Sequence, residues 1–391
     1  MINLQGKRNS AVIYADKIDK PTKTQIASIL REEAYADNKI RIMPDTHSGK
    51  YGPVGTTMTL GNRLCPALLG VDIGCGMEAV VLNDKTADLE KLDDFIHKNI
   101  PCGAKIHLTP KASFDFSRLL CAENVDKERA LLSLGSLGGG NHFIELDKAE
   151  DGTLVLVIHS GSRQLGSDTA MYYLDQAYRY QCKKARKRTK QRRSDDDFGG
   201  FKSFKSYGDG KVQLPKKEES ILEGPLFEEY LQDISVVTEF AELNRRTIAE
   251  LICDSMGFSV KERFSCVHNY IDTEHGILRK GAISARQGER VIIPLNMRDG
   301  AILGTGRGNP EWNFSAPHGA GRACSRSDAR AAYTLEEFQK QMEGIYTTTA
   351  QIGSVEECPM AYKAPERILQ FLGDTVSVEQ IIKPVYNFKD C

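Results

Sequence analysis

The chain has 391 residues, which exceeds the usual size of one hydrophobic core, although large mixed α/β domains reach this length undivided. We therefore expect a single domain spanning residues 1–391. The chain carries 52 Lys and Arg residues against 53 Asp and Glu residues, a formal net charge of -1. This balance excludes a strong general attraction for nucleic acid and leaves only local contacts with polyanions.

The sequence shows no signal for export or for a membrane. No stretch approaches the roughly 18 apolar residues of a membrane span, and the start, MINLQGKRNS, lacks the apolar core and cleavage site of a secretory signal. Ten cysteines are scattered singly without a CxxC pair, which is typical of reduced thiols. We expect a soluble, cytoplasmic protein without a membrane partner.

The first half of the chain is predicted to be rich in strands. Between these strands, apolar residues at helical spacing predict surface helices at 87–100 and 123–137. The strands are predicted from short apolar runs that glycines interrupt, at 54–60, 67–73, 78–82, 142–146 and 154–159.

The middle of the chain is strongly basic and then polar. A predicted helix over 167–193 ends in KKARKRTKQRR at 183–193, which is either a solvated helix tip or a contact with the phosphate backbone of nucleic acid. Residues 195–224 are rich in Gly, Ser, Lys and Asp, a composition typical of an exposed loop. Together they predict an exposed basic and polar insertion at about 183–224.

The second half returns to regular structure. A long helix is predicted over 226–256, and a helical region begins near Gly321. Strands are predicted at 264–271, 277–284 and 290–294 and around Val385. This mixture of elements indicates an α+β fold.

Four short motifs at the edges of predicted strands carry side chains that bind metals. Asp72 and Cys75 lie in GVDIGCGM, His142 in LGGGNHF, His159 in VIHSGSR and His268 in VHNY. Each motif alone is as well explained by a buried cysteine, a turn aspartate or a core histidine. Together they predict one cluster that binds a borderline transition metal, and these residue types leave manganese, zinc and iron open.

A fifth motif, SAPHGAGRACSR, surrounds His318 with small residues and is followed by Arg322 and Arg326. Small residues let phosphates approach the backbone, and guanidinium groups bind phosphate in a bidentate manner. A neutral imidazole is a competent nucleophile toward phosphorus. The chain has no GxxxxGK[ST] phosphate loop. We therefore predict that covalent nucleotide chemistry runs through His318, with a metal ligand or a general acid as its alternative roles.

Seven motifs in this order strongly resemble the RtcB family of RNA-splicing ligases over residues 43–389. They are MPDTHSGK, GVDIGCGM, LGGGNHFIEL, VIHSGSR, VHNY, RKGAISA and SAPHGAGR. The resemblance implies an RtcB-like α+β fold, with mixed β-sheets around a central metal cleft and helices around them. It also implies two Mn²⁺ ions bridged by the thiolate of Cys75, one held by His159 and His268 and the other by Asp72 and His142.

The resemblance further implies a GTP-dependent reaction. His318 would attack the α-phosphate of GTP, and the resulting guanylate would pass to an RNA 3'-phosphate, which can arise from a 2',3'-cyclic phosphate. An RNA 5'-hydroxyl would then displace GMP. Asp45 and Lys280 would assist catalysis, while Arg163 and Arg322 would bind RNA or phosphate. The guanylate would be held by Asn141, Phe143, Glu145, Asn269, Gly319, Gly321, Tyr362 and Lys389.

One segment departs from the family pattern. Residues 293–315, IPLNMRDGAILGTGRGNPEWNFS, stand where many members carry a shorter IPGxMG segment, which leaves the nucleotide specificity open. Two alternative functions are a metal-dependent 2',3'-cyclic phosphodiesterase without ligation, and a non-catalytic protein that binds RNA ends. The natural RNA, whether transfer RNA, ribosomal RNA or another strand, and the need for an activating protein partner also stay open.

Overall fold

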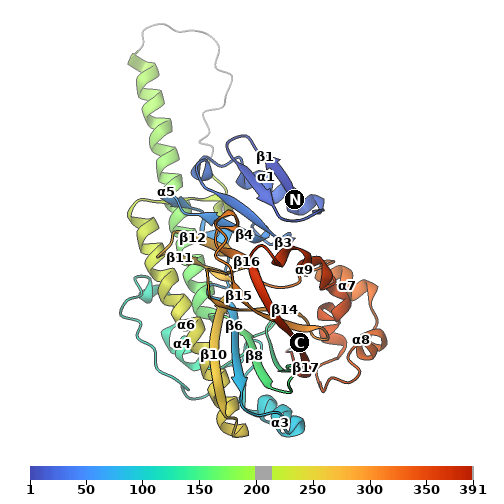
Figure 1. Cartoon of the computed structure of the whole chain (residues 1–391). Helices are drawn as coiled ribbons and strands as arrows, with labels where there is room; N and C mark the ends of the chain where they lie inside the picture. Colours follow the sequence, from blue (N-terminus) through green and yellow to red (C-terminus); the bar gives the residue numbers. More distant parts are fainter. Residues whose placement is uncertain (199–213, 390–391) are drawn as a thin grey trace.

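The computed structural model describes residues 1–198 and 214–389, and in it two large β-sheets form the framework (Figure 1). The six-stranded sheet has the order β1-β2-β3-β4-β12-β11, and only its β2–β3 pair is parallel. Its strands are β1 (Ile2–Gln5), β2 (Ser10–Ile13), β3 (Ile40–His47), β4 (Val54–Thr59), β11 (Asn269–Asp272) and β12 (Ile277–Lys280).

The seven-stranded sheet is antiparallel throughout and has the order β10-β6-β8-β7-β17-β15-β14. Two short pairs accompany the large sheets, β5 (Arg63–Leu64) with β9 (Leu222–Glu223) and β13 (Ala282–Ser284) with β16 (Ser315–Pro317). The seven strands are β6 (Gly76–Leu82), β7 (Phe143–Lys148), β8 (Leu154–Ser160), β10 (Val260–Val267), β14 (Arg290–Asn296), β15 (Gly300–Gly306) and β17 (Val376–Phe388).

Helices cover both sheets, and α5 projects beyond the rest of the described chain (Figure 1). Among the described residues, no helix is both long enough and apolar enough to cross a membrane. The helices are α1 (Lys20–Ile29), α2 (Pro66–Leu69), α3 (Leu89–Asn99), α4 (Lys127–Ser133), α5 (Arg163–Phe198), α6 (Pro225–Met256), α7 (Arg326–Ala332), α8 (Leu335–Gln341) and α9 (Glu366–Leu372).

The seven-stranded sheet has a different apolar core on each face. On one face, Ile144 and Ile158 pack with Ile248 and Ile252 of α6. On the other face lie side chains of β14 and β15 together with Ile368 and Leu372 of α9. Successive strand residues point to opposite faces, so every side chain of a central strand faces one of these two apolar cores. A polar side chain in either core therefore requires a specific explanation.

Most of the predicted elements are present, and the α+β class is confirmed. The helix predicted at 87–100 is α3, and the helix predicted at 226–256 is α6. The helix predicted at 123–137 is shorter, because the Asp126 carboxylate caps the start of α4 and Gly135, with φ of +82°, follows its end.

The strand predicted at 67–73 is wrong, because Pro66 to Leu69 form the short helix α2. Pro66 occupies the first helical position, where its fixed φ is favourable, and Gly70 ends the turn with φ of +90°. A short apolar run is compatible with a buried helix as well as with a buried strand.

Two predicted strands each divide into two, and the divisions are structurally important. The run at 264–271 leaves the seven-stranded sheet as β10 and enters the six-stranded sheet as β11, with His268 between them. The run at 277–284 divides at Gly281, whose φ is +63°. The Gly281 and Ala282 amides both donate to the His268 carbonyl, at 2.6 and 3.1 Å. Both divisions therefore lie where the two sheets meet.

The predicted insertion at 183–224 is wrong at its carboxyl end. Ile221 and Leu222 are buried, and Leu222 pairs with Leu64 in the β5–β9 pair. The basic segment 183–193 continues α5, and Lys184 forms an ion pair with Glu223. Residues 199–213 lie outside the described residues.

The buried guanidinium of Arg245 on α6 ties the helix to both segments that lead to the sheet junction. It donates to the Gly74 carbonyl at 2.7 Å and to the Ser160 carbonyl at 3.0 Å. We expect Arg245→Met to lower the free energy of unfolding by about 2–4 kcal/mol, because it leaves buried carbonyls without donors. Urea denaturation measures this loss, and the exposed neighbour Arg246→Met should change stability by less than about 0.5 kcal/mol.

Candidate metal centre and adjoining cleft

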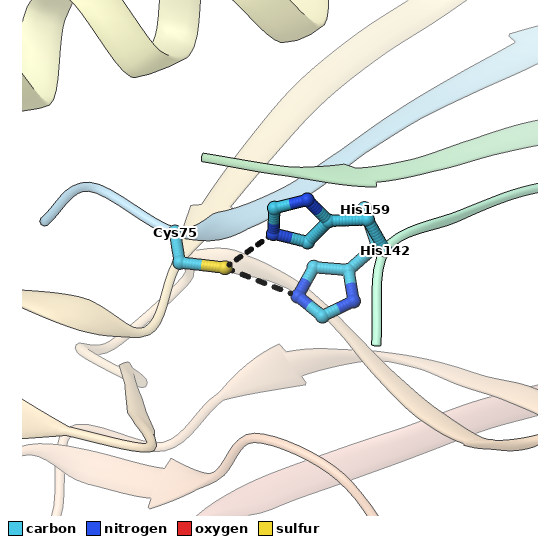
Figure 2. Close-up of side chains that lie close together, drawn as sticks. All are labelled: Cys75, His142 and His159. Carbon is cyan, nitrogen blue, oxygen red and sulfur yellow. Dashed lines mark hydrogen bonds between the residues drawn. The ribbon is translucent and has the colours of Figure 1, made fainter. Parts of the chain in front are cut away.

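Strand ends of the seven-stranded sheet bring the predicted ligands together. Cys75 directly precedes β6, His142 directly precedes β7, and His159 is the last residue but one of β8. His159 is the cross-strand partner of both Met77 and Phe143. The sulfur atom of Cys75 faces both imidazole rings (Figure 2).

The distances among these groups are short. Cys75 Sγ lies 3.3 Å from His159 Nε2 and 3.6 Å from His142 Nε2. His159 Nε2 also lies 3.3 Å from His268 Nε2, and His142 Nε2 lies 3.2 Å from a carboxylate oxygen of Asp72. The structure therefore brings all five predicted ligands into one cluster.

Backbone carbonyls orient two of the rings. His142 Nδ1 lies 2.9 Å from the Leu137 carbonyl, and His159 Nδ1 lies 2.9 Å from the Asn141 carbonyl. A carbonyl accepts only from a protonated nitrogen, so each Nδ1 carries the proton and each Nε2 presents its lone pair toward Cys75. This arrangement of the second nitrogen is usual for histidines that bind metals.

Burial favours the neutral imidazoles of His159 and His268 and the protonated thiol of Cys75 when no ion is present. Burial lowers the pKa values of His159 and His268 well below the ordinary value and raises the pKa of Cys75 well above it.

These residues fit a divalent transition metal. His159 Nε2 and His268 Nε2 face each other at 3.3 Å, a separation at which one cation can be bound by both rings. One thiol, three imidazoles and one carboxylate form a mixed donor set that suits a borderline metal. The ligand atoms of Cys75, His142 and His159 all lie within 4.8 Å of one another.

A cleft adjoins this cluster and reaches His318. Its lining includes two of the candidate ligands, His159 and His268, and most of the residues predicted to hold a nucleotide. These predicted residues are Asn141, Phe143, Glu145, Gly319, Gly321, Tyr362 and Lys389. The lining also includes His318, the predicted nucleophile, and Arg322, a predicted contact for RNA or phosphate.

His318 directly follows β16 and is oriented by a buried carboxylate from β3. Its Nδ1 lies 2.6 Å from Asp45 Oδ2, and its backbone amide donates to the same oxygen at 3.2 Å. Asp45 is fully buried, and the His318 ring lies 4.9 Å from that of His268, centroid to centroid. Gly321 permits this approach, because a Cβ there would lie 2.2 Å from the Asp45 carbonyl oxygen.

One wall of the cleft is cationic and is organised by the buried carboxylate of Glu357. Arg322 and Lys389 approach this carboxylate at 3.1 and 3.2 Å, and Arg326 approaches it at 3.2 Å. The Tyr362 hydroxyl donates to it as well. Burial opposes ionisation of Glu357, but Lys389, Tyr362 and the two arginines lower its pKa to about 2. The carboxylate is therefore ionised and fixes these four groups.

Three predicted residues lie outside the lining of this cleft and are neither candidate metal ligands nor in contact with His318. Asn269 donates to the Asp72 carbonyl at 2.6 Å, and the Lys280 amine donates to the Leu69 carbonyl at 2.9 Å. Burial lowers the pKa of Lys280 to about 8. Arg163, with φ of +54°, donates to Ser136 Oγ and to the Gly103 carbonyl. In this structure these side chains support loops around the cluster.

Other cleft residues were not predicted from the sequence. His47 lines the cleft, and burial lowers its pKa to about 4. Asn387, which lines the cleft, and Glu357, which contacts lining residues, are buried polar residues whose partners become apparent only in three dimensions. The sequence pattern could have indicated Asn387, because it lies between Tyr386 and Phe388. These two aromatic residues belong to the core on one face of the sheet, so Asn387 points to the opposite face.

Fold and site together define an α+β protein with a candidate transition-metal centre beside a cleft suited to anions. A family model described as tRNA-splicing ligase RtcB matches residues 28–120 and 110–390. The chain belongs to the RtcB family.

Similar proteins come from bacteria and archaea. The RNA-splicing ligase RtcB of Escherichia coli (strain K12) is 28% identical, with 88% of each chain covered. The tRNA-splicing ligase RtcB of Aeropyrum pernix is 25% identical, with 93% of this chain and 91% of the relative covered. The protein of the same name from Methanococcus maripaludis is 27% identical, with 85% and 84% covered.

The candidate metal centre can be tested with Co²⁺, whose bond to a thiolate gives a charge-transfer absorption band. We expect the protein titrated with Co²⁺ to develop this band and Cys75→Ser to lack it, because Cys75 supplies the only sulfur of the cluster. Cys324→Ser, a change in a half-buried thiol outside the cleft lining, should leave the band unchanged. A band that survives Cys75→Ser would contradict the assignment.

Proposed function

We propose that this protein is an RNA ligase that joins RNA 3'-phosphate or 2',3'-cyclic phosphate ends to 5'-hydroxyl ends, with GTP and Mn²⁺ as cofactors. The observation that carries the proposal is the position of His318, oriented by Asp45 at 2.6 Å between the metal candidates and the cationic wall. The printed names of the relatives, RNA-splicing and tRNA-splicing ligase, support the same class of reaction.

In the proposed first step, His318 attacks the α-phosphorus of GTP. Asp45 holds the proton on Nδ1, so Nε2 is the atom with a free lone pair. A nitrogen–phosphorus bond forms from this lone pair, and the bond to pyrophosphate breaks. Asp45 stabilises the positive charge that the ring acquires, as a buried carboxylate does beside a catalytic histidine.

In the following steps, an oxygen of the RNA 3'-phosphate takes the guanylate from His318, and the 5'-hydroxyl then displaces GMP. Arg322, Arg326 and Lys389 bind the phosphate groups during these transfers. Asp72, Cys75, His142, His159 and His268 would hold Mn²⁺, whose charge neutralises phosphate oxygens. The 5'-hydroxyl loses its proton to solvent water as its oxygen bonds to phosphorus and GMP leaves.

The first test is a covalent adduct with labelled GTP. We expect an adduct that is labile in acid and stable in alkali, as a phosphoramidate is, and we expect His318→Ala to abolish it. His275→Ala is the matched control, because His275 is half exposed and pairs with Asp272 outside the cleft. An adduct that persists in His318→Ala would overturn the assignment of the nucleophile.

The same reaction separates the proposed ligase from its alternatives. Opening of a cyclic phosphate at full rate without GTP, with no joined product, would favour a cyclic phosphodiesterase. Binding of RNA ends without an adduct, cyclic-phosphate opening or a joined product would favour a non-catalytic RNA-end binding protein.

Asp45→Asn tests the orientation of His318. An asparagine amide would donate to Nδ1, so the ring would carry its proton on Nε2 and lose the attacking lone pair. We expect the rate of adduct formation to fall by about 10²–10⁴-fold while GDP binding changes little. Rapid-quench measurement of the adduct and calorimetry with GDP give the two quantities. Equal falls in the rate of adduct formation and in the affinity for GDP would contradict an orienting role.

A further inference from the structure

Three buried polar side chains interrupt an otherwise apolar face of the seven-stranded sheet. Glu145, Asp147 and Asn387 are 3%, 0% and 1% exposed. Glu145 and Asp147 project from β7, and Asn387 is the cross-strand partner of Glu145 on β17. On β8, the partners of the two acids are Val157 and Val155, which belong to the apolar core of this face.

The hydrogen bonds of this group are incomplete among the described residues. The Asn387 amide group donates to Glu145 Oε2 at 2.6 Å, but Asn387 Oδ1 has no hydrogen-bond partner within the described chain. The two carboxylate oxygens of Asp147 also have no hydrogen-bond partner among the described residues. A buried acceptor without a donor costs about 1–3 kcal/mol, so the fold alone does not explain these residues.

Two of the three residues face the cleft. Glu145 and Asn387 line it together with the aromatic rings of Phe143 and Tyr362, and Asp147 lies behind them. Burial raises the pKa of Glu145 to about 7, and burial together with Glu145 raises the pKa of Asp147 well above its ordinary value. This rise in the pKa of Asp147 opposes a second negative charge beside Glu145.

The polar atoms available to a ligand here are acceptors. Asn387 Oδ1 is unpaired among the described residues, and its amide group already donates to Glu145, which leaves that carboxylate one further oxygen. Two acceptors side by side match a planar group with two adjacent N–H donors. Guanine presents such an edge, a ring N–H beside an exocyclic amine, whereas adenine presents a ring acceptor beside its amine.

We propose that Asn387 is a nucleobase-reading residue, whose Oδ1 accepts from the exocyclic amine of guanine while Glu145 accepts from the adjacent ring N–H. The inference rests on the proposed function, because it requires a nucleotide in this cleft. It adds to that function a specificity residue from the carboxyl-terminal strand. Asp147 is a positioning residue, because it lies next to Glu145 on the same face of β7 but does not line the cleft.

The test compares GDP with IDP, which lacks only the exocyclic amine. Diphosphates are used because they bind without forming the guanylate adduct. By calorimetry with Mn²⁺, we expect the unaltered protein to bind GDP about 10–100-fold more tightly than IDP, which corresponds to leaving one buried acceptor unpaired. Asn387→Leu should abolish the preference for GDP over IDP and retain the affinity for IDP. Asn387→Ala, a smaller change, should do the same if the leucine variant does not fold.

Gln380→Leu is the matched control, because it makes the same kind of change on β17 outside the cleft lining, and it should keep the ratio. Equal losses for GDP and IDP in the Asn387 variants would show a purely structural role and overturn the inference while leaving the proposed function intact. Tighter binding of ADP than of GDP by the unaltered protein would also overturn it. Failure of the unaltered protein to bind any of the three nucleotides would overturn the proposed function as well.

Discussion

The contact between His159 Nε2 and His268 Nε2, at 3.3 Å, is the constraint on which the site depends. His159 ends a strand of the seven-stranded sheet, and His268 lies where the chain crosses to the six-stranded sheet. The same contact therefore joins the two sheets and places the lone pair of His159 Nε2 against the ring of His268. Cys75 Sγ and both imidazoles converge at this point, and such a donor set suits a transition metal, so the sheet junction is best understood as built around an ion.

The junction is held by groups that are not ligands. Arg245 binds the carbonyls of Gly74 and Ser160, and Asn244 binds Ser160 Oγ and the Gly161 carbonyl. Both residues lie on α6, so one helix fixes the loop before Cys75 and the end of β8 at the same time. Precise ligand placement depends on such supporting contacts.

The sequence predicted the parts of the site that lie within short motifs. His142, His159 and His268 each adjoin a strand end, and a strand end is where side chains of neighbouring strands converge. The crossing of the chain at His268 was not predictable, because both halves of the run at 264–271 have the same apolar strand pattern and differ only in the sheet that they join. The helix α2 was missed for a related reason, since four apolar residues are too few to show a period.

Residues that act through distant partners were the hardest to predict. Glu357 carries no motif, yet it meets Arg322 and Lys389, and the latter is 32 positions away in the printed sequence. Because Glu357 holds these cations before any ligand arrives, little side-chain entropy is lost when a phosphate binds. The buried carboxylate also offsets their mutual repulsion. A chain with a net charge of -1 can therefore present a dense local cation wall at one cleft.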